Sequence, residues 1–265
     1  SWTLGTFFAL GICAIYLLRK KNVEFAKRNL KIIAPFGLLA ALLSAVTGHS
    51  SAVDVANNQP MKLAAMEALY DAGVSTPEGK TADGKGLGLG MAGVLNPKKQ
   101  LPDDAHAPYL FSVEVPRLLS YMVDGTPDRY VPGVINILEG GYHKPDGSVA
   151  LSTEEMMRRG RIAIDALNAF RSARKAGDSI GAEQHRAVLE ENFPYYGYGY
   201  FTSKYESVPN IPLTYYSFRI MVGLGGAFLL LFILLTWYTY KRNEELPRTK
   251  WLLWASLLLT PCAWI

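Results

Sequence analysis

The sequence predicts an all-α integral membrane protein in which two hairpin-like pairs of transmembrane helices flank a long, partly helical extracytoplasmic loop. Three observations lead to this prediction. Apolar residues concentrate in four runs near the two ends of the 265-residue chain, each pair of runs is joined by a short basic connection, and the polar middle carries more acidic than basic residues. The mean hydropathy of +0.09 hides this division, because it averages apolar ends with a polar centre.

The four runs have the composition of membrane spans. A spanning helix needs roughly 17–25 residues. The third run meets this requirement alone, the first two lie near its lower limit, and we expect the fourth to be truncated. A buried core helix is the alternative for a short run, but it would not explain paired runs joined by basic turns. The runs are Trp2–Leu18, Ile32–Thr47, Ile220–Tyr240 and Trp251–Ile265.

Charge sets the expected orientation. The connection Arg19–Lys31 carries six cations and one anion, Lys241–Lys250 carries four cations and two anions, and the middle carries 16 cations and 20 anions. Because positively charged loops stay in the cytoplasm, the two connections are predicted to be cytoplasmic and the middle extracytoplasmic. The predicted organisation is two transmembrane helices in 1–47, the extracytoplasmic loop in 48–217 and a second, truncated helix pair in 218–265.

Cysteine and histidine usage limits the chemistry. The only cysteines, Cys13 and Cys262, lie in apolar runs, so neither a disulfide scaffold nor a cysteine-ligated zinc site is expected. All four histidines lie in the middle segment, without the spacing of a zinc motif. A complete haem site with a histidine ligand therefore cannot form within these apolar runs alone. No nucleic-acid partner is expected.

Much of the middle segment is predicted to be irregular. Thr76–Asp104 is rich in Gly, Pro and Lys and is expected to be a flexible loop. Its Gly84–Gly90 stretch resembles a nucleotide-binding loop only superficially, because no strand precedes it and no GK[ST] follows. Pro108–Met122 is expected to fold back on the membrane surface. Tyr195–Phe201, aromatic and glycine-rich, has two readings: a hydrophobic access route for a lipid-soluble ligand, or an interfacial anchor.

Ser152–Lys175 has the clearest pattern of a helix outside the membrane. Ser152 and Glu155 form a capping-box pattern, apolar residues follow one stripe, and Gly177 can stop the helix. Its five arginines are expected to form a solvated face, with lipid headgroups as the alternative partner.

A second, shorter helix is predicted over Pro60–Tyr70, with Asn58 as its cap and Gly73 at its end. Lys62 and Glu67 are its only charged side chains. Five residues apart, they are separated by about 140° around the axis and do not form an i,i+4 pair. They could still bracket one ligand, the carboxylate accepting a hydroxyl proton and the ammonium holding an oxygen. On the pattern alone, ordinary structural roles are the simpler reading.

Arg219 and Met221 are predicted at the extracytoplasmic mouth of the third span. Methionine can be an axial haem ligand, and arginine can pair with haem propionates. The alternative is an arginine that snorkels to the interface and a methionine that only packs. The glycines that follow allow close helix packing or close approach of a flat cofactor; they are Gly223, Gly225 and Gly226.

Together these segments resemble a known family. The stretch from Gly48-His-Ser-Ser to Gln59-Pro-Met-Lys-Leu-Ala-Ala-Met-Glu67, followed by Ser217-Phe-Arg-Ile-Met-Val-Gly223, resembles subunit I of cytochrome bd quinol oxidase. Tyr16–Arg19 and Phe25–Arg28 are similar to that family's preceding helix and cytoplasmic turn. The resemblance covers nearly the whole chain and is weakest in Thr76–Tyr195.

The resemblance implies specific roles. Lys62 and Glu67 match a lysine and a glutamate implicated in quinol oxidation. Met221 matches the axial methionine of the low-spin haem b, the first electron acceptor, and Arg219 matches the arginine beside that haem. Quinol would enter from the outer leaflet, Glu67 would take a proton and Lys62 would orient or polarise the ring oxygen.

The resemblance also implies a larger assembly in a bacterial cytoplasmic membrane. Electrons would continue to further b-type and d-type haems, where oxygen is reduced with cytoplasmic protons. A second large subunit and small subunits would be partners. The histidine opposite Met221 is expected before Ser1, and the remaining haem ligands before Ser1 and after Ile265. This part of the subunit alone is therefore not expected to reduce oxygen.

Two rival readings remain. A transporter or membrane sensor with an extracytoplasmic ligand-binding domain would bind its ligand without redox change, and the joint presence of the Lys62/Glu67 and Arg219/Met221 segments argues against it. A different membrane b-type cytochrome would normally carry histidines inside its spans, and these runs have none.

Overall fold

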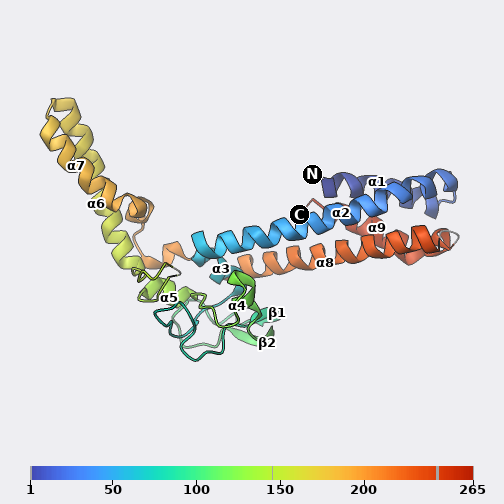
Figure 1. The fold of residues 1–265 in the computed structure, drawn as a ribbon, viewed down its shortest axis with the longest axis horizontal. Helices are drawn as coiled ribbons and strands as arrows, with labels where there is room; N and C mark the ends of the chain where they lie inside the picture. Colours follow the sequence, from blue (N-terminus) through green and yellow to red (C-terminus); the bar gives the residue numbers. More distant parts are fainter. Residues whose placement is uncertain (1, 145, 243–244, 265) are drawn as a thin grey trace. The chain divides into compact units, whose positions relative to one another are not determined.

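The computed structural model describes residues 2–144, 146–242 and 245–264. Its contacts divide the chain into two compact units, one formed by Ser1–Ser51 with Ser217–Ile265 and the other by Ala52–Tyr216. Two long helices, α2 (Val23–Asn58) and α8 (Ile211–Lys241), contribute residues to both units. Figure 1 shows helices in both units and, in the second, a small sheet among irregular segments.

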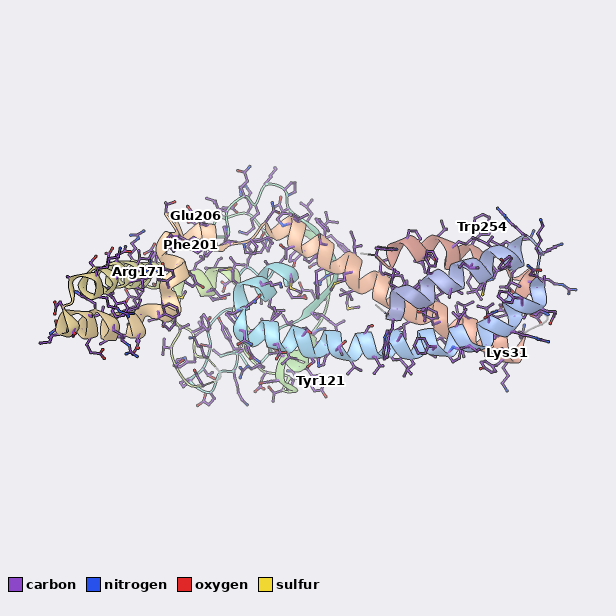
Figure 2. All side chains as sticks on the ribbon, turned by 90° about the horizontal axis from the view of Figure 1, so that it is seen from above. Lys31, Tyr121, Arg171, Phe201, Glu206 and Trp254 are labelled. Carbon is purple, nitrogen blue, oxygen red and sulfur yellow. The ribbon has the colours of Figure 1, made fainter. Side chains whose placement is uncertain are left out.

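The first unit is a set of apolar helices that pack through aromatic and aliphatic side chains. It contains α1 (Trp2–Leu18), the short η3 (Leu246–Arg248), α9 (Lys250–Cys262) and parts of α2 and α8. The ring of Phe7 packs on Phe228 and Phe232, with centroids 4.5 and 5.0 Å away. At Gly37 of α2 a Cβ atom would collide with the Phe232 ring, so glycine is what allows this close approach. Large apolar and aromatic side chains on the outside, such as Trp254, remain exposed (Figure 2).

Two stretches of the described chain are long and apolar enough to cross a membrane: α2, and Lys204–Lys241, which contains α8. Helix α1 is apolar but shorter, and α9 has 13 residues. The prediction of four spans therefore stays a prediction, with two of them having the required length.

Helix α1 has the bounds of the first predicted run, whereas α2 extends beyond those of the second. α1 ends at Leu18 and α2 begins at Val23, so Lys27, Arg28 and Lys31 lie within a helix rather than in a loop. α2 continues eleven residues past Thr47. Intrahelical hydrogen bonding continues past both ends of the apolar run, so hydropathy alone predicted too short a helix.

The part of the second unit around α3 (Pro60–Glu67) contains short elements and a small sheet. Strands β1 (Leu89–Leu95) and β2 (Tyr109–Val115) pair antiparallel, followed by α4 (Leu118–Asp124) and α5 (Val134–Glu139). The shared core lies between α3, α5 and the start of α8, and its buried members include Ala64, Ala65, Val134, Ile137 and Tyr215.

The other part of the second unit is a helical hairpin, α6 (Thr153–Ala176) and α7 (Ser179–Asn192), with the short helices η1 (Phe193–Tyr200) and η2 (Lys204–Ser207). Figure 1 shows α6 and α7 side by side. Ser152 caps α6 by accepting a hydrogen bond from the Glu155 amide, and Gly177 ends it in the left-handed conformation. Figure 2 labels Arg171 on α6 and Phe201 just after η1.

Three expectations for the middle segment need correction. Thr76–Asp104 is not entirely a loop, because its second half contains β1, whose partner β2 occupies much of Pro108–Met122. The helix predicted over Pro60–Tyr70 is α3, and it ends at Glu67 because Ala68 adopts a left-handed conformation. Gly73 therefore does not end it. Its N-cap is Gln59 rather than Asn58, whose amide instead donates to the Asp54 carbonyl.

Candidate functional site

Helix α3 is held firmly at both ends. Pro60 occupies its first turn, where a missing N–H costs nothing. After Ala68, the chain is tied to α5, because the amides of Val134 and Ile135 donate to the carbonyls of Leu69 and Tyr70 at 2.9 and 2.8 Å. The side of α3 that carries Leu63, Ala64 and Ala65 is buried. The short helix is thus positioned by contacts far apart in the sequence.

Glu67, the last residue of α3, is a buried acidic residue. Only 6% of the residue is exposed. It lines a cavity of about 510 Å³ together with the glycine-rich stretch, side chains of β2 and a lysine between the strands; these residues include Gly86, Gly88, Gly90, Lys99, Tyr109 and Glu114. The Tyr109 hydroxyl donates to the Glu67 carbonyl at 2.8 Å, which fixes the end of α3 against β2. The stretch Gly84–Gly90, predicted to be a mobile loop, therefore forms a wall of the Glu67 cavity.

Lys62 lies elsewhere on α3. Its side chain is exposed, and it is not among the described residues that line the Glu67 cavity. This agrees with the wide angular separation of the two residues around the helix. The structure thus places Lys62 and Glu67 on different sides of one short helix, and contact of both with one ligand would need that ligand to reach around α3.

A buried ion pair supports the cavity wall. The Lys99 ammonium, whose side chain is 5% exposed, contacts Asp104 Oδ1 at 3.3 Å and donates to the carbonyls of Asp104 and His106. Burial of the Asp104 carboxyl raises its pKa. Hydrogen bonds from three backbone amides and from Lys99 outweigh burial and lower the pKa of Asp104 to about 2. Lys99 also lies 4.8 Å above the Tyr70 ring, which extends the wall by a cation–π contact.

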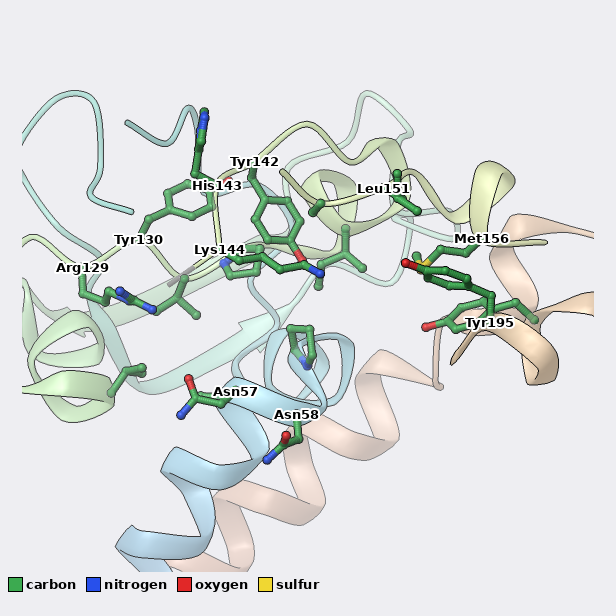
Figure 3. Close-up of a pocket in the computed structure, with 18 residues that line it drawn as sticks. Asn57, Asn58, Arg129, Tyr130, Tyr142, His143, Lys144, Leu151, Met156 and Tyr195 are labelled. Carbon is green, nitrogen blue, oxygen red and sulfur yellow. The ribbon is translucent and has the colours of Figure 1, made fainter. Parts of the chain in front are cut away.

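A second cavity, of about 250 Å³, is lined by other residues of the same unit (Figure 3). Figure 3 shows Arg129 and Lys144 extending toward it, Asn57 and Asn58 below it, and the ring of His143 pointing away. Burial, followed by the charge of Tyr198, raises the pKa of the Tyr142 phenol to about 12. The phenol therefore stays protonated at neutral pH and is a hydrogen-bond donor. Tyr195 and Tyr198 of the aromatic stretch also line this cavity, which leaves both readings of that stretch open.

Arg219 and Met221 lie on α8, in the other unit. At 100° per residue they are about 160° apart around the helix. Met221 is 52% exposed, whereas Arg219 is half-buried and its guanidinium lies 5.6 Å from the Phe218 ring centroid. Gly225, one turn after Met221, has open space where a Cβ would point. An accessible thioether beside a bare stretch of helix is chemically compatible with one half of a haem-binding face.

Residue patterns did not predict that Tyr109 and Lys99 line a cavity, or that Gly86 and Gly88 form part of its wall. Tyr109 begins strand β2, and because that strand was not predicted, nothing indicated where its side chain would point. The available signal was the alternation Gly86-Leu-Gly-Leu-Gly-Met91, since alternation of small and apolar residues is typical of a strand edge or a close backbone approach.

These features define a class of helical protein in which long apolar helices flank a folded polar segment that buries a carboxylate at a cavity. The family model described as "Cytochrome bd terminal oxidase subunit I" matches residues 1–265, and the chain belongs to that family. This confirms the resemblance found in the sequence.

Two relatives are similar over nearly the whole chain. "Cytochrome bd-II ubiquinol oxidase subunit 1" of Escherichia coli (strain K12) is 27% identical over 279 residues, covering 100% of this chain and 48% of the relative. "Cytochrome bd ubiquinol oxidase subunit 1" of Bacillus subtilis (strain 168) is 27% identical over 250 residues, covering 94% of this chain and 37% of the relative. The chain thus spans less than half the length of the curated relatives it matches.

Proposed function

We propose that this chain is the quinol-oxidising part of subunit I of a cytochrome bd-type terminal oxidase in a bacterial cytoplasmic membrane. The observation that carries the proposal is that the buried acidic residue Glu67, at the end of α3, lines a 510 Å³ cavity in a chain that belongs to this family. The names of two relatives specify ubiquinol oxidases, which supports a quinol as the substrate.

In this proposal Glu67 accepts a proton from a quinol hydroxyl. A carboxylate can act as a general base when it lies within hydrogen-bond reach of that hydroxyl. The cavity walls position the ring: the backbone at Gly86 and Gly88 lets it approach closely, and the Tyr109 hydroxyl holds the Glu67 backbone in place. Lys62 is exposed on another side of α3 and lies outside the cavity lining, so its proposed role is to orient or polarise the ring oxygen of a quinol that reaches around α3.

The electron acceptor in this proposal is a low-spin haem b. Met221 would supply one axial ligand from the exposed side of α8, and Arg219 would pair with the propionates. The bound haem would supply one-electron redox chemistry. Further b-type and d-type haems, a second large subunit and small subunits belong to the complete oxidase, and protons from quinol would leave on the extracytoplasmic side.

Replacement of Glu67 tests the acid–base role. Glu67→Gln keeps the size of the side chain but removes the proton acceptor, so quinol-dependent haem b reduction is expected to slow by about 10²-fold or more, within the usual range for a lost general base. The measurement is stopped-flow reduction of the full-length oxidase by a quinol. Glu183→Gln, on the exposed face of α7, is the matched control and should reduce at the wild-type rate.

The control and the variant distinguish two failures. If Glu67→Gln keeps the wild-type reduction rate, Glu67 is not the base. If the wild-type protein shows no quinol-dependent haem reduction at all, the oxidase function is wrong and the transporter or sensor reading gains support.

Replacement of Met221 tests the haem ligand. Met221→Leu preserves the apolar volume but removes the sulfur, so the low-spin haem b signal in the reduced-minus-oxidised spectrum is expected to be lost or converted to high spin while the other haems persist. Met66→Leu, on α3, is the control and should leave the spectrum unchanged. An unaltered spectrum of Met221→Leu would remove Met221 as a ligand.

A further inference from the structure

The β1–β2 sheet has two chemically different faces. Residues directly opposite each other on antiparallel strands point to the same side, so the register defines each face. One face carries the pairs Gly90–Glu114, Gly93–Ser112 and Leu95–Tyr109. We call it the inner face, because Gly90, Tyr109 and Glu114 line the Glu67 cavity and Leu95 is buried in the core.

The opposite face, the outer face, is entirely apolar. It is formed by the pairs Leu89–Val115, Ala92–Val113 and Val94–Phe111. At the two irregularities in the register, the strands add Met91 and Leu110, both also exposed. Phe111 alone is 62% exposed. No charged or polar side chain interrupts this face.

Such a face is unusual for a sheet in contact with water. Antiparallel sheets that face solvent on one side normally carry polar residues there. A contiguous exposed apolar patch on a folded protein marks contact with another protein or with a membrane. The outer face therefore has an apolar neighbour in the intact protein.

The anchoring of the sheet indicates which neighbour. The Leu95 amide donates to the Tyr216 hydroxyl at 3.0 Å, and the ring of Tyr109 packs on Tyr215 with centroids 6.0 Å apart. Both partners lie in α8, and the apolar run of that helix begins at Ile220, about one turn further along uninterrupted helix. Tyrosines at such a position are typical of the lipid–water interface.

Charge at the ends of the sheet agrees with this location. Lys85 and Arg117 near one end, and Lys98 at the other, are exposed cations; the exposed anions Asp83 and Asp103 lie in the same segments. Arg117 is turned toward the glycine-rich stretch, where its Nε donates to the Lys85 carbonyl at 3.2 Å. An apolar surface bordered by charged side chains that include three cations matches the layered chemistry of a bilayer surface, in which acyl chains lie beneath anionic phosphates.

We propose that the outer face of the β1–β2 sheet is embedded in the interfacial region of the lipid bilayer. The apolar side chains displace water there, and the flanking cations meet lipid phosphates. The sheet then acts as a lateral anchor of the polar segment, and a single layer of β-structure separates the lipid from the Glu67 cavity. This inference depends on membrane insertion of α8 but not on quinol chemistry.

Site-directed spin labelling tests the inference directly. A single cysteine replaces Phe111 in the full-length protein after every native cysteine, Cys13 and Cys262 among them, is replaced by serine. The labelled protein is placed in nanodiscs of phosphatidylcholine and phosphatidylglycerol. Collision with oxygen, which concentrates in lipid, is compared with collision with a water-soluble nickel chelate. Ile180→Cys on α7, where the native side chain is 75% exposed, is the control.

The expected result is an oxygen-to-nickel accessibility ratio several-fold higher at position 111 than at position 180. An equal ratio at the two positions would show that the outer face meets water and would overturn the inference. Low accessibility to both reagents at position 111 would show that protein covers the face, which would overturn it as well. Val113→Cys, on the same face, repeats the measurement if Phe111→Cys does not fold.

Discussion

The two parts of the polar segment hold their shape by different means. The α6–α7 hairpin is built from local signals: a serine cap, a glycine stop, and ion pairs one helical turn apart, such as Glu155 with Arg158 and Arg159 at 2.6 and 3.1 Å. The region around α3 is held by contacts between residues far apart in the chain. Tyr109 bonds to Glu67, and Asn136 Oδ1 accepts from the Ala72 amide at 2.9 Å.

This difference means that the region with the more regular structure is not the region that can bind a ligand. Local helical signals specify a regular element but create no cavity, whereas short elements tied together by long-range contacts leave space between them. Both cavities described here are lined mainly by the irregular region, and Glu67 lies at one of them. The comparison predicts that equal structural damage in the two regions has unequal effects on activity.

The largest expected effect comes from paired glycine substitutions. At Gly133 a Cβ would lie 2.7 Å from the Tyr70 carbonyl oxygen, and at Gly160 a Cβ would collide with the backbone of Tyr195 and Gly199. Gly133→Val and Gly160→Val should each destabilise local packing by about 1–3 kcal/mol, the usual cost of overpacking. Gly133→Val is expected to abolish quinol oxidation, because it displaces α5 from α3. Gly160→Val should retain most of it.

The measurement combines quinol oxidase turnover with hydrogen exchange of the two regions. Exchange confirms that each substitution loosens its own region, and turnover then reports whether that region matters for chemistry. Equal loss of turnover in both variants would break the comparison, since it would make the hairpin as necessary as the α3 region.

A smaller effect is expected from removal of single hydroxyls. Tyr109→Phe removes the hydrogen bond to the Glu67 carbonyl, worth about 1 kcal/mol. Loss of this contact should lower kcat/KM for quinol by a few-fold through misplacement of Glu67. Tyr196→Phe removes a hydroxyl contact of 2.8 Å with Tyr200 in η1 and is the matched control. Steady-state kinetics should separate the two, and an unaffected Tyr109→Phe would mean that α3 is held adequately without that bond.

The sequence predicts the regular hairpin more closely than the site region, for the same physical reason. Ser152, Glu155 and Gly177 act within one helix, so their pattern can be interpreted without knowledge of the rest of the chain, and the structure confirms the cap and the stop. The left-handed conformation of Ala68 could not be predicted, because alanine gives no local signal for it.

The two strands were not predicted because each is stabilised mainly by pairing with the other, and neither segment has a strong strand pattern by itself. β1 is short and rich in glycine, which disfavours a strand in isolation. Pairing with β2, separated from it by a loop, stabilises both. The position of Glu67 at a cavity likewise depends on the glycine-rich wall folding against it. Family resemblance pointed to Lys62, Glu67, Arg219 and Met221, but their packing required the structure.

The smallest expected effect is the response of each region to acid. Hydrogen bonds from Arg158 and Arg159 lower the pKa of Glu155 to about 2, and backbone amides with Lys99 bring Asp104 to the same value despite burial. Both folded-state pKa values lie below the ordinary ones of 4.5 and 3.8. Each carboxylate therefore contributes its full stabilisation above its ordinary pKa and loses it as pH falls toward 2.

Hydrogen exchange, corrected for intrinsic rate, should detect both losses in segments that contain Asp104 and Glu155. Protonation of Glu155, which removes the charge that pairs with Arg158 and Arg159, should fray only the first turn of α6, because the rest of the helix keeps its own hydrogen bonds. Loss at Asp104 should release the loop between the strands, since three backbone amides and Lys99 depend on one carboxylate. Asp104→Asn and Glu155→Gln should each remove the pH dependence of their own segment. A wider opening around Glu155 than around Asp104 would reverse the distinction between local and long-range stabilisation.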